Sequence, residues 1–323
     1  MNRCHAVIGG LVIVLVLSLM LAPSQPAAAT PKPQAPIPFE DRSDPVLLIQ
    51  SYYNAIVLRD YARAYGYWDS APQGQTLTQF SAGFAQTTDV WVVVSTLIRE
   101  GVAAGTTYDA VPTLLIASQT NGTVKAYVGC FTAKVSRVET TTDTNVADNP
   151  WSLANETSGF EEIALEDVDV NLMRTSCNPP ALGDLVVDSR ESPIWLLRSY
   201  FNAVHLKDYA RAYNYWSSPP NGLSFNQFVQ GYANTTDIFV ALLLGIQYDG
   251  AAGSTFVSMP TILIGTEKNA TPQRYYGCYV ARSSNVGSGP TPPPPFWSFY
   301  SASIKVAPDD ATDIELLTTP CEL

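Results

Sequence analysis

Two stretches of this chain are nearly the same sequence. Residues 44–68 read DPVLLIQSYYNAIVLRDYARAYGYW, and residues 192–216 read SPIWLLRSYFNAVHLKDYARAYNYW. They align without a gap at an offset of 148 residues, with 15 identities in 25 positions. The same offset carries Phe80 onto Phe228, Pro112 onto Pro260, and Gly129-Cys130 onto Gly277-Cys278. A register kept over this length indicates a tandem duplication of a whole small domain, because solenoid repeats are far shorter.

Each copy is predicted to begin with a helix. Pro45 and Pro193 follow Asp44 and Ser192. Proline suits the first turn of a helix, where its missing N–H would have no partner, and Asp and Ser are favoured capping residues. The repeated stretch therefore opens with a capped helix in both copies.

A second, short helix is predicted after Asp60, and after Asp208 in the second copy, with each aspartate capping the helix that follows. Aromatic residues recur along it at helical spacing, at Tyr61, Tyr65 and Trp68. After a third helix, the pattern changes to segments rich in β-branched and aromatic residues, which are typical of strands. The expected fold class is α+β, with two tandem copies of a domain made of three helices and a curved antiparallel sheet.

This order of elements resembles a known superfamily. A first helix with the segment YYNA (52–55), a second helix opened by RDY or KDY and closed at a tryptophan, a third helix and a curved sheet are similar to the nuclear-transport-factor-2-like superfamily, also called the cystatin-like α+β cone. The resemblance covers most of each copy and is closer to uncharacterised secreted bacterial members than to the enzymes. It implies a cavity between the helices and the concave face of the sheet, and it brings no catalytic residue with it.

Six aromatic residues are the candidates to line such a cavity. Rings with an apolar body and a polar tip suit a ligand site, although an aromatic stripe at helical spacing is more often part of a filled core. The candidates are Tyr52, Tyr65 and Trp68 in the first copy and Tyr200, Tyr213 and Trp216 in the second.

The chain opens with the features of an export signal. Arg3 precedes an apolar run from Ala6 to Ala22, and Ala27-Ala28-Ala29 offers an Ala-x-Ala cleavage site. An uncleaved membrane anchor is the alternative, and a run of 17 residues is short for one. We expect a protein that is secreted or held at an extracytoplasmic surface. The predicted organisation is a signal peptide (1–29), a proline-rich tether (30–43), a first α+β domain (44–180), a linker (181–191) and a second α+β domain (192–323).

Four cysteines follow the predicted signal peptide, two in each copy. In an exported protein such pairs indicate structural disulfides. Four cysteines allow three pairings, and we favour Cys130 with Cys177 and Cys278 with Cys321, because a duplicated domain would carry its own bridge. A redox pair is the alternative, although the sequence contains no C-x-x-C.

Composition excludes several classes of function. The net charge is −11, from 18 basic and 29 acidic residues, which gives no electrostatic basis for binding nucleic acid or anionic lipid. Of the two histidines, His205 is expected at the end of the first helix of the second copy, and Val57 is its counterpart. No zinc-ligand spacing, phosphate-binding loop or dinucleotide motif occurs, so no metal or cofactor is predicted. Asp89 and Asp237 are expected in a turn or at an edge, between the third helix and the first strand.

We expect a non-catalytic binding or interaction module. Its partner would be a small molecule or an envelope or protein component, with membrane contact only through an uncleaved N-terminal segment. The alternative is a cavity enzyme of the same superfamily, such as an isomerase, dehydratase or hydrolase, in which Asp60, Asp89 or a tyrosine would transfer the proton. A third reading is a structural envelope protein with filled cores. An open cavity with an inward carboxylate within reach of a tyrosine would favour the enzyme.

Overall fold

The computed structural model describes residues 38–96, 98–136, 150–155, 158–177, 186–245, 248–251, 253–284, 296–319 and 321. The predicted signal peptide (1–29) lies outside these residues, as do most of the tether and the first part of the linker. Within the described residues, no helix combines the length and the apolar character needed to cross a membrane.

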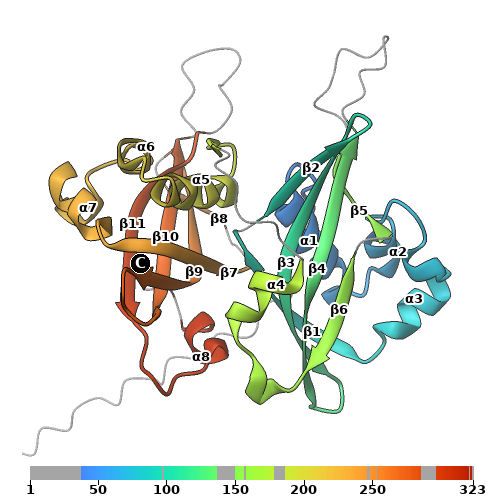
Figure 1. Cartoon of the computed structure of the whole chain (residues 1–323). Helices are drawn as coiled ribbons and strands as arrows, with labels where there is room; N and C mark the ends of the chain where they lie inside the picture. Colours follow the sequence, from blue (N-terminus) through green and yellow to red (C-terminus); the bar gives the residue numbers. More distant parts are fainter. Residues whose placement is uncertain are drawn as a thin grey trace, which may run out of the picture. The chain divides into compact units, whose positions relative to one another are not determined.

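The first half of the described chain has three helices before its strands, as the sequence predicts, and a further short helix after them that the sequence analysis does not anticipate (Figure 1). The short strand β2 was not anticipated, and the predicted last strand region is divided between β5 and β6. The elements are α1 (Pro45–Val57), α2 (Tyr61–Tyr65), η1 (Pro72–Gly74), α3 (Leu77–Gly83), β1 (Thr87–Ser95), β2 (Arg99–Ala103), β3 (Thr106–Gln119), β4 (Val124–Ser136), β5 (Ser152–Leu153), β6 (Gly159–Ile163), η4 (Leu165–Asp167), η5 (Val170–Leu172) and α4 (Met173–Ser176).

The second half repeats this order. Its first helix begins and ends 148 residues after α1, and β7 and β9 begin 148 residues after β1 and β3. The elements are α5 (Pro193–His205), α6 (Tyr209–Asn214), η6 (Pro220–Gly222), α7 (Phe225–Tyr232), β7 (Thr235–Leu243), β8 (Tyr248–Ala251), β9 (Ser254–Glu267), β10 (Gln273–Ser284), β11 (Ser298–Val306) and α8 (Asp313–Leu317).

The predicted caps open the first helix of each half. The side chain of Asp44 accepts hydrogen bonds from the backbone N–H groups of Val46 and Leu47 at α1, and Ser192 accepts one from Trp195 at α5. These caps satisfy N–H groups that the first turn of a helix leaves without a partner. The local sequence therefore determines where these helices begin.

All the strands form one antiparallel sheet. Its main order is β11-β10-β9-β7-β1-β3-β4-β5, with β2 and β8 pairing with β3 and β9 and β6 pairing with β4. The strands β3 and β9 each contain 14 residues and pair along one edge with two successive strands. The fold is therefore α+β with a large antiparallel sheet.

The two halves join through β1 and β7. The paired residues are Val93 with Leu243, Val94 with Leu242, and Ser95 with Ala241. Val94 and Leu242 are equivalent positions of the repeat. Val93 is equivalent to Ala241 and Ser95 to Leu243, so interchanging the two halves converts each of the other two pairs into the other. The flanking hydrogen bonds, Thr96 N–H to the Val240 carbonyl and Leu244 N–H to the Val92 carbonyl, exchange in the same way. The junction therefore has local twofold pseudo-symmetry, like an isologous contact between two copies.

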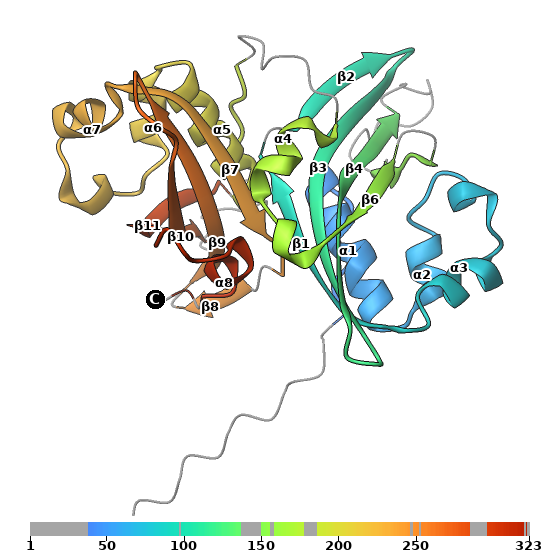
Figure 2. The ribbon, with the colours of Figure 1, turned by 60° about the horizontal axis from the view of Figure 1, so that its bottom comes forward.

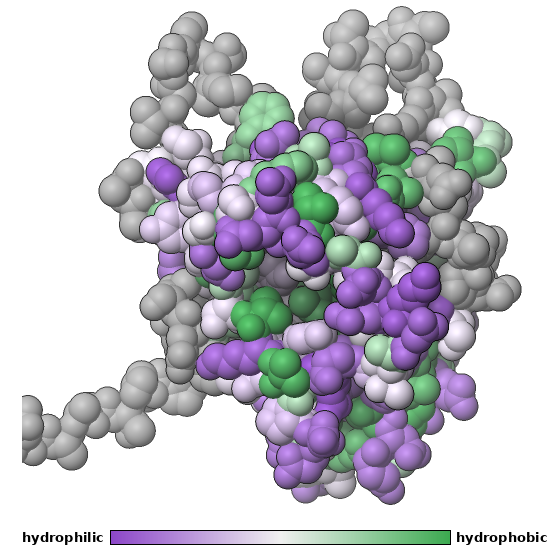
Figure 3. Space-filling view, turned by 60° about the vertical axis from the view of Figure 1, so that its left-hand side comes forward, coloured by the Kyte–Doolittle hydropathy of each residue, from purple (hydrophilic) through white to green (hydrophobic). Residues whose placement is uncertain are grey.

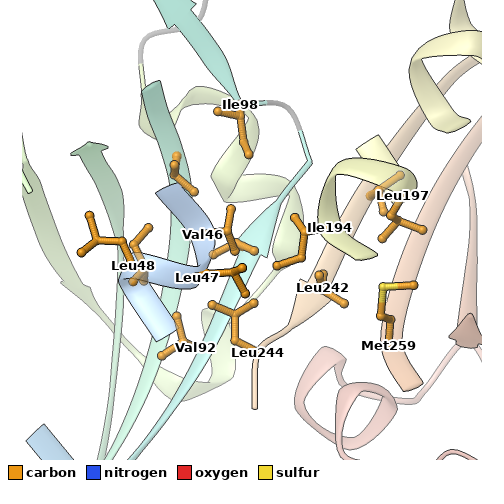
Figure 4. Close-up of a cluster of buried hydrophobic side chains, with 14 of the residues drawn as sticks. Val46, Leu47, Leu48, Val92, Ile98, Ile194, Leu197, Leu242, Leu244 and Met259 are labelled. Atoms are coloured by element: carbon orange, nitrogen blue, oxygen red, sulfur yellow. The ribbon is translucent and has the colours of Figure 1, made fainter. Parts of the chain in front are cut away.

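Both faces of this sheet are buried by helices. The helices α1–α3 and α5–α7 pack on one face, where a single hydrophobic cluster includes residues of both halves. Figure 4 shows its central part, with Leu47 and Ile194 beside Leu242 and Leu244. The short helices α4 and α8 cover the opposite face, and Figure 2 shows α4 on the side of the first-half strands away from α1.

One disulfide closes each half. Cys130 of β4 is bonded to Cys177 after α4, and Cys278 of β10 is bonded to Cys321 after α8, with Cα–Cα distances of 5.0 and 5.6 Å. This is the within-copy pairing that the sequence analysis favours. Disulfides of this kind are typical of an oxidising, extracytoplasmic compartment.

Candidate functional site

A cavity of about 360 Å³ lies between the helices and the sheet of the second half. Tyr200 of α5 and Trp216, two of the six aromatic candidates, line it. Figure 3 faces this half of the molecule and shows hydrophobic side chains in a hollow among hydrophilic ones. The other side chains that form most of its wall are Phe228 and Tyr232 from α7, Ile238 from β7, Leu263 from β9, Tyr279 from β10 and Ile304 from β11.

The remaining candidate of the second half, Tyr213, is not part of this lining. Its hydroxyl donates to the backbone carbonyl of Leu223, at 2.8 Å, and Leu223 lines the cavity. Tyr213 therefore positions the segment after η6 at the cavity. Among the lining residues, sequence reasoning missed Tyr232 and Tyr279, because nothing in the helix or strand pattern shows that both side chains face the same space.

Two tyrosine hydroxyls form a hydrogen-bonded pair in the lining of this cavity. The hydroxyl oxygens of Tyr200 and Tyr232 lie 2.8 Å apart and share a hydrogen bond. Burial raises the pKa of Tyr200 well above its ordinary value, and the neighbouring Tyr232 and Tyr279 raise it further. Burial also raises the pKa of Tyr232. Both groups therefore stay neutral at physiological pH, and because they share one bond, one O–H remains to donate to a ligand.

The cavity lacks the acid–base arrangement that would favour an enzyme. Among the described residues that line it, Glu267 is the only carboxylate, and it is exposed at the end of β9. A general acid or base must lie within hydrogen-bond reach of the atom that it protonates or deprotonates. Glu267 has no hydrogen bond to Tyr200 or Tyr232 within the part of the chain that the structure describes.

The equivalent space in the first half contains a larger side chain at one position. Ile304 pairs with Gly277 in the second half, whereas Phe160 pairs with the equivalent Gly129 in the first half. The ring of Phe160 packs against Phe131, with centroids 4.7 Å apart. A phenylalanine thus fills first-half volume that an isoleucine leaves open in the second.

The three first-half candidates take part in this packing. Tyr52 is 3% exposed, and its ring lies edge-on to Trp68 at 5.8 Å between centroids. The hydroxyl of Tyr65 donates to the backbone carbonyl of Gln75 at 2.8 Å. The sequence could not show which half has the open cavity, because all three candidate positions carry the same aromatic residue in both halves.

The repeated aspartates before the second helices have structural partners. Asp60 accepts from the backbone N–H of Arg63 and forms an ion pair with its guanidinium at 3.1 Å. The same guanidinium donates to the carbonyl of Phe39 and to the side chain of Asn54, at 2.9 and 3.2 Å. Asp208 and Arg211 repeat the ion pair in the second half, at 3.0 Å. The pair therefore secures the segment before each first helix.

The position expected for Asp89 and Asp237 was wrong. Both lie inside strands, β1 and β7, and not in a preceding turn. The strands begin two residues earlier, because Thr87 pairs with Gln119 and the equivalent threonine pairs in the same way, with a register shift before each aspartate. His205 ends α5, as predicted.

A buried charged group links the two halves. Arg198 of α5 is 8% exposed, and its guanidinium donates to the carbonyl of Ile98 at 2.8 Å. The carboxylates of Asp109 and Asp44, both in the first half, stabilise its charge. Burial raises the pKa of Asp44 to about 6, although its backbone hydrogen bonds and Arg198 oppose the increase. No sequence signal pointed to this group, because its members come from separate elements.

Within the described residues, no group of three or more His, Cys, Asp or Glu side chains could hold a metal ion. Comparison with models of protein families, with curated proteins and with solved structures gave no match. The site is therefore interpreted from its own geometry.

Proposed function

We propose that this chain is an extracytoplasmic binding protein made of two tandem cone-like domains similar to the nuclear-transport-factor-2-like superfamily. Residues 1–29 would direct export, and residues 30–43 would separate the first domain from the cleavage site or the membrane. The repeated element order, the within-copy disulfides and the proline-rich composition of the tether support this organisation.

The second domain would bind a small, mainly apolar molecule that carries a hydrogen-bond acceptor. The observation that supports this proposal is the cavity of about 360 Å³, a volume within the range typical of small-molecule sites. Its aromatic wall would contact the apolar body of the ligand, and the hydroxyl pair of Tyr200 and Tyr232 would bind its polar atom. The first domain would be mainly structural, with Phe160 in its interior.

A thermal-shift screen of metabolites and envelope fragments on residues 31–323 tests this proposal. We expect a small apolar compound to raise the melting temperature of the native protein, because a ligand of the folded state stabilises it by mass action. The variant Ile304→Phe places in the second half the side chain that the first half has, and it should abolish the shift.

Phe160→Ile is the matched control, since it makes the reverse exchange in the first half and leaves the second-half cavity intact, so the shift should persist. A hit that persists in Ile304→Phe would place the binding elsewhere. A compound that is chemically converted during the assay would contradict the non-catalytic part of the proposal and favour the cavity enzyme.

A further inference from the structure

A guanidinium group is held on the outer face of the sheet in the second half. Arg174, on α4 of the first half, forms an ion pair with Asp237 of β7 at 2.9 Å. Its guanidinium carbon lies 4.5 Å from the ring centroid of Phe239, two residues further along the strand. A carboxylate and an aromatic face thus bind the same cation, through a charge-assisted hydrogen bond and a cation–π contact.

The first half carries the same pair of groups on β1. Asp89 and Trp91 are equivalent to Asp237 and Phe239 at the offset of 148 residues. Alternate residues of a strand share a face, and the cross-strand pairing is equivalent as well, because Asp89 lies opposite Ser118 and Asp237 lies opposite Thr266. Both halves therefore present a carboxylate beside an aromatic ring at the same place on the sheet.

The Asp89–Trp91 pair and the Asp237–Phe239 pair differ in how far other parts of the chain bury them. Phe239 is fully buried, whereas Trp91 is 39% exposed and Asp89 is exposed. Asp89 forms no ion pair within the described residues, and one of its oxygens accepts from the backbone N–H of Val90 at 2.9 Å.

The chain supplies an arginine to only one of these places. Arg174 lies three residues before Cys177, and three residues before Cys321 stands Thr318. A threonine side chain carries no positive charge and cannot replace the guanidinium. Among the described residues, Arg174 lies over Phe239, and no cation–π contact or ion pair involves Trp91 or Asp89.

We propose that Asp89 and Trp91 form a docking site for an arginine side chain of a partner protein. Tryptophan is the best aromatic partner for a cation, and a guanidinium also matches a carboxylate better than an ammonium does. Val124, which is 38% exposed, lies two strands from Asp89 in the same cross-strand row, opposite Ser118. The net charge of −11 favours the approach of a basic partner.

Titration of the exported chain, residues 30–323, with a short peptide that contains one arginine tests this site. The indole N–H signal of Trp91 is followed by NMR. We expect a saturable shift that disappears when citrulline replaces the arginine, because citrulline has a similar shape without the charge. Asp89→Asn and Trp91→Leu should each weaken binding roughly tenfold, and added salt should weaken it further.

Asp237→Asn is the matched control, because it makes the same change where the chain already supplies the arginine, and it should leave peptide binding unchanged. Since Asp89 and Trp91 are exposed, their variants should keep the native melting temperature. A shift that the citrulline peptide or Asp89→Asn reproduces would overturn the proposal, as would the absence of a saturable shift. Equal affinity for argininamide and for the peptide would also contradict docking of a protein, because the site would then recognise a free small guanidinium compound.

Discussion

At Gly129 two strands approach so closely that a side chain has no room. A Cβ atom at this position of β4 would overlap the carbonyl oxygen of Gly159 and would lie 2.6 Å from a ring carbon of Phe160. The repeat preserves this requirement, since a Cβ atom at Gly277 would overlap the carbonyl oxygen of Ser303. Phe160 can therefore pack against Phe131 only because Gly129 has no side chain.

We expect Gly129→Ala to destabilise the protein by about 1–3 kcal/mol, because the added methyl group forces the strands apart. The free energy of unfolding in urea measures the effect. Gly101→Ala on β2 is the control, since nothing lies within 4 Å of the Cβ atom that it adds. Equal stability of the two variants would show that the strands separate at no cost.

Asp44 combines a cap with a buried charge. Its cap follows from the local sequence, but its burial depends on Arg198 and other residues far away in the chain. Burial raises the pKa of Asp44 from 3.8 to about 6 in the folded protein. Between these two pH values the folded state binds a proton that the unfolded chain has released, so this group makes the protein less stable as pH rises, and the loss is complete above about pH 6.

We therefore expect Asp44→Asn to be more stable than the native protein at pH 7, by about 2–3 kcal/mol, while the two have similar stability near pH 4. Asparagine is an equally good cap, so the helix itself should be unaffected. Urea denaturation at both pH values measures the difference. If the free energies of unfolding of the variant and the native protein differed by the same amount at both pH values, Asp44 would be ionised over the whole range.

At the scale of elements, the sequence predicts what depends on local chemistry. The helix starts at Pro45 and Pro193, the caps at Asp60 and Asp208 and the strand-rich second part of each half follow from residue type and spacing. The short strands β2 and β8 and the division of the last first-half strand into β5 and β6 depend on pairing with distant strands, so no local pattern predicts them.

The disulfides attach a short helix to each end of the sheet. Cys130–Cys177 closes a loop of 47 residues and places α4, with Arg174, against the sheet. We expect the variant with both Cys130→Ala and Cys177→Ala to lose about 4 kcal/mol of stability, because the unfolded chain regains its loop entropy. Chemical denaturation under non-reducing conditions measures this loss. A stability equal to that of the native protein would mean that the rest of the fold already restricts this segment.

The two halves share one sheet and its two hydrophobic clusters. The junction of β1 and β7 continues the sheet across both halves, and the hydrophobic clusters on its two faces contain residues of both. Contacts between the halves add to this, since the Asp313 carboxylate accepts from the Val170 N–H at 2.8 Å and Arg174 pairs with Asp237. The duplication was evident from the sequence, but this pairing of the copies was not, because the residues of β1 and β7 would suit a buried strand in either arrangement.

We expect thermal unfolding in a single transition, with equal calorimetric and van't Hoff enthalpies. Gly129→Ala, a change within the first half, should lower the temperature of that single transition. Differential scanning calorimetry measures both properties. Two separate transitions, with only one of them shifted by the variant, would show that the halves unfold independently.

The cavity is the feature that the sequence predicts least well. The six aromatic candidates have the same residue types in both halves, and the difference arises where Phe160 stands opposite Gly129 and Ile304 stands opposite Gly277. That exchange lies in the last strand region, where the two copies differ most in sequence and in how the strands are divided.

Binding of acetophenone, observed by NMR on the native protein, tests the central claim most directly. Acetophenone is small and largely apolar, which suits the mainly aromatic and aliphatic walls of the second-half cavity, and its carbonyl oxygen can accept the O–H that the Tyr200–Tyr232 pair leaves free. We predict one saturable site whose largest shifts fall on residues around Tyr200, Tyr232 and Ile304, and whose binding is lost in Ile304→Phe. No saturable site, or a site that remains in Ile304→Phe, would contradict the proposal that the second half binds its ligand in this cavity.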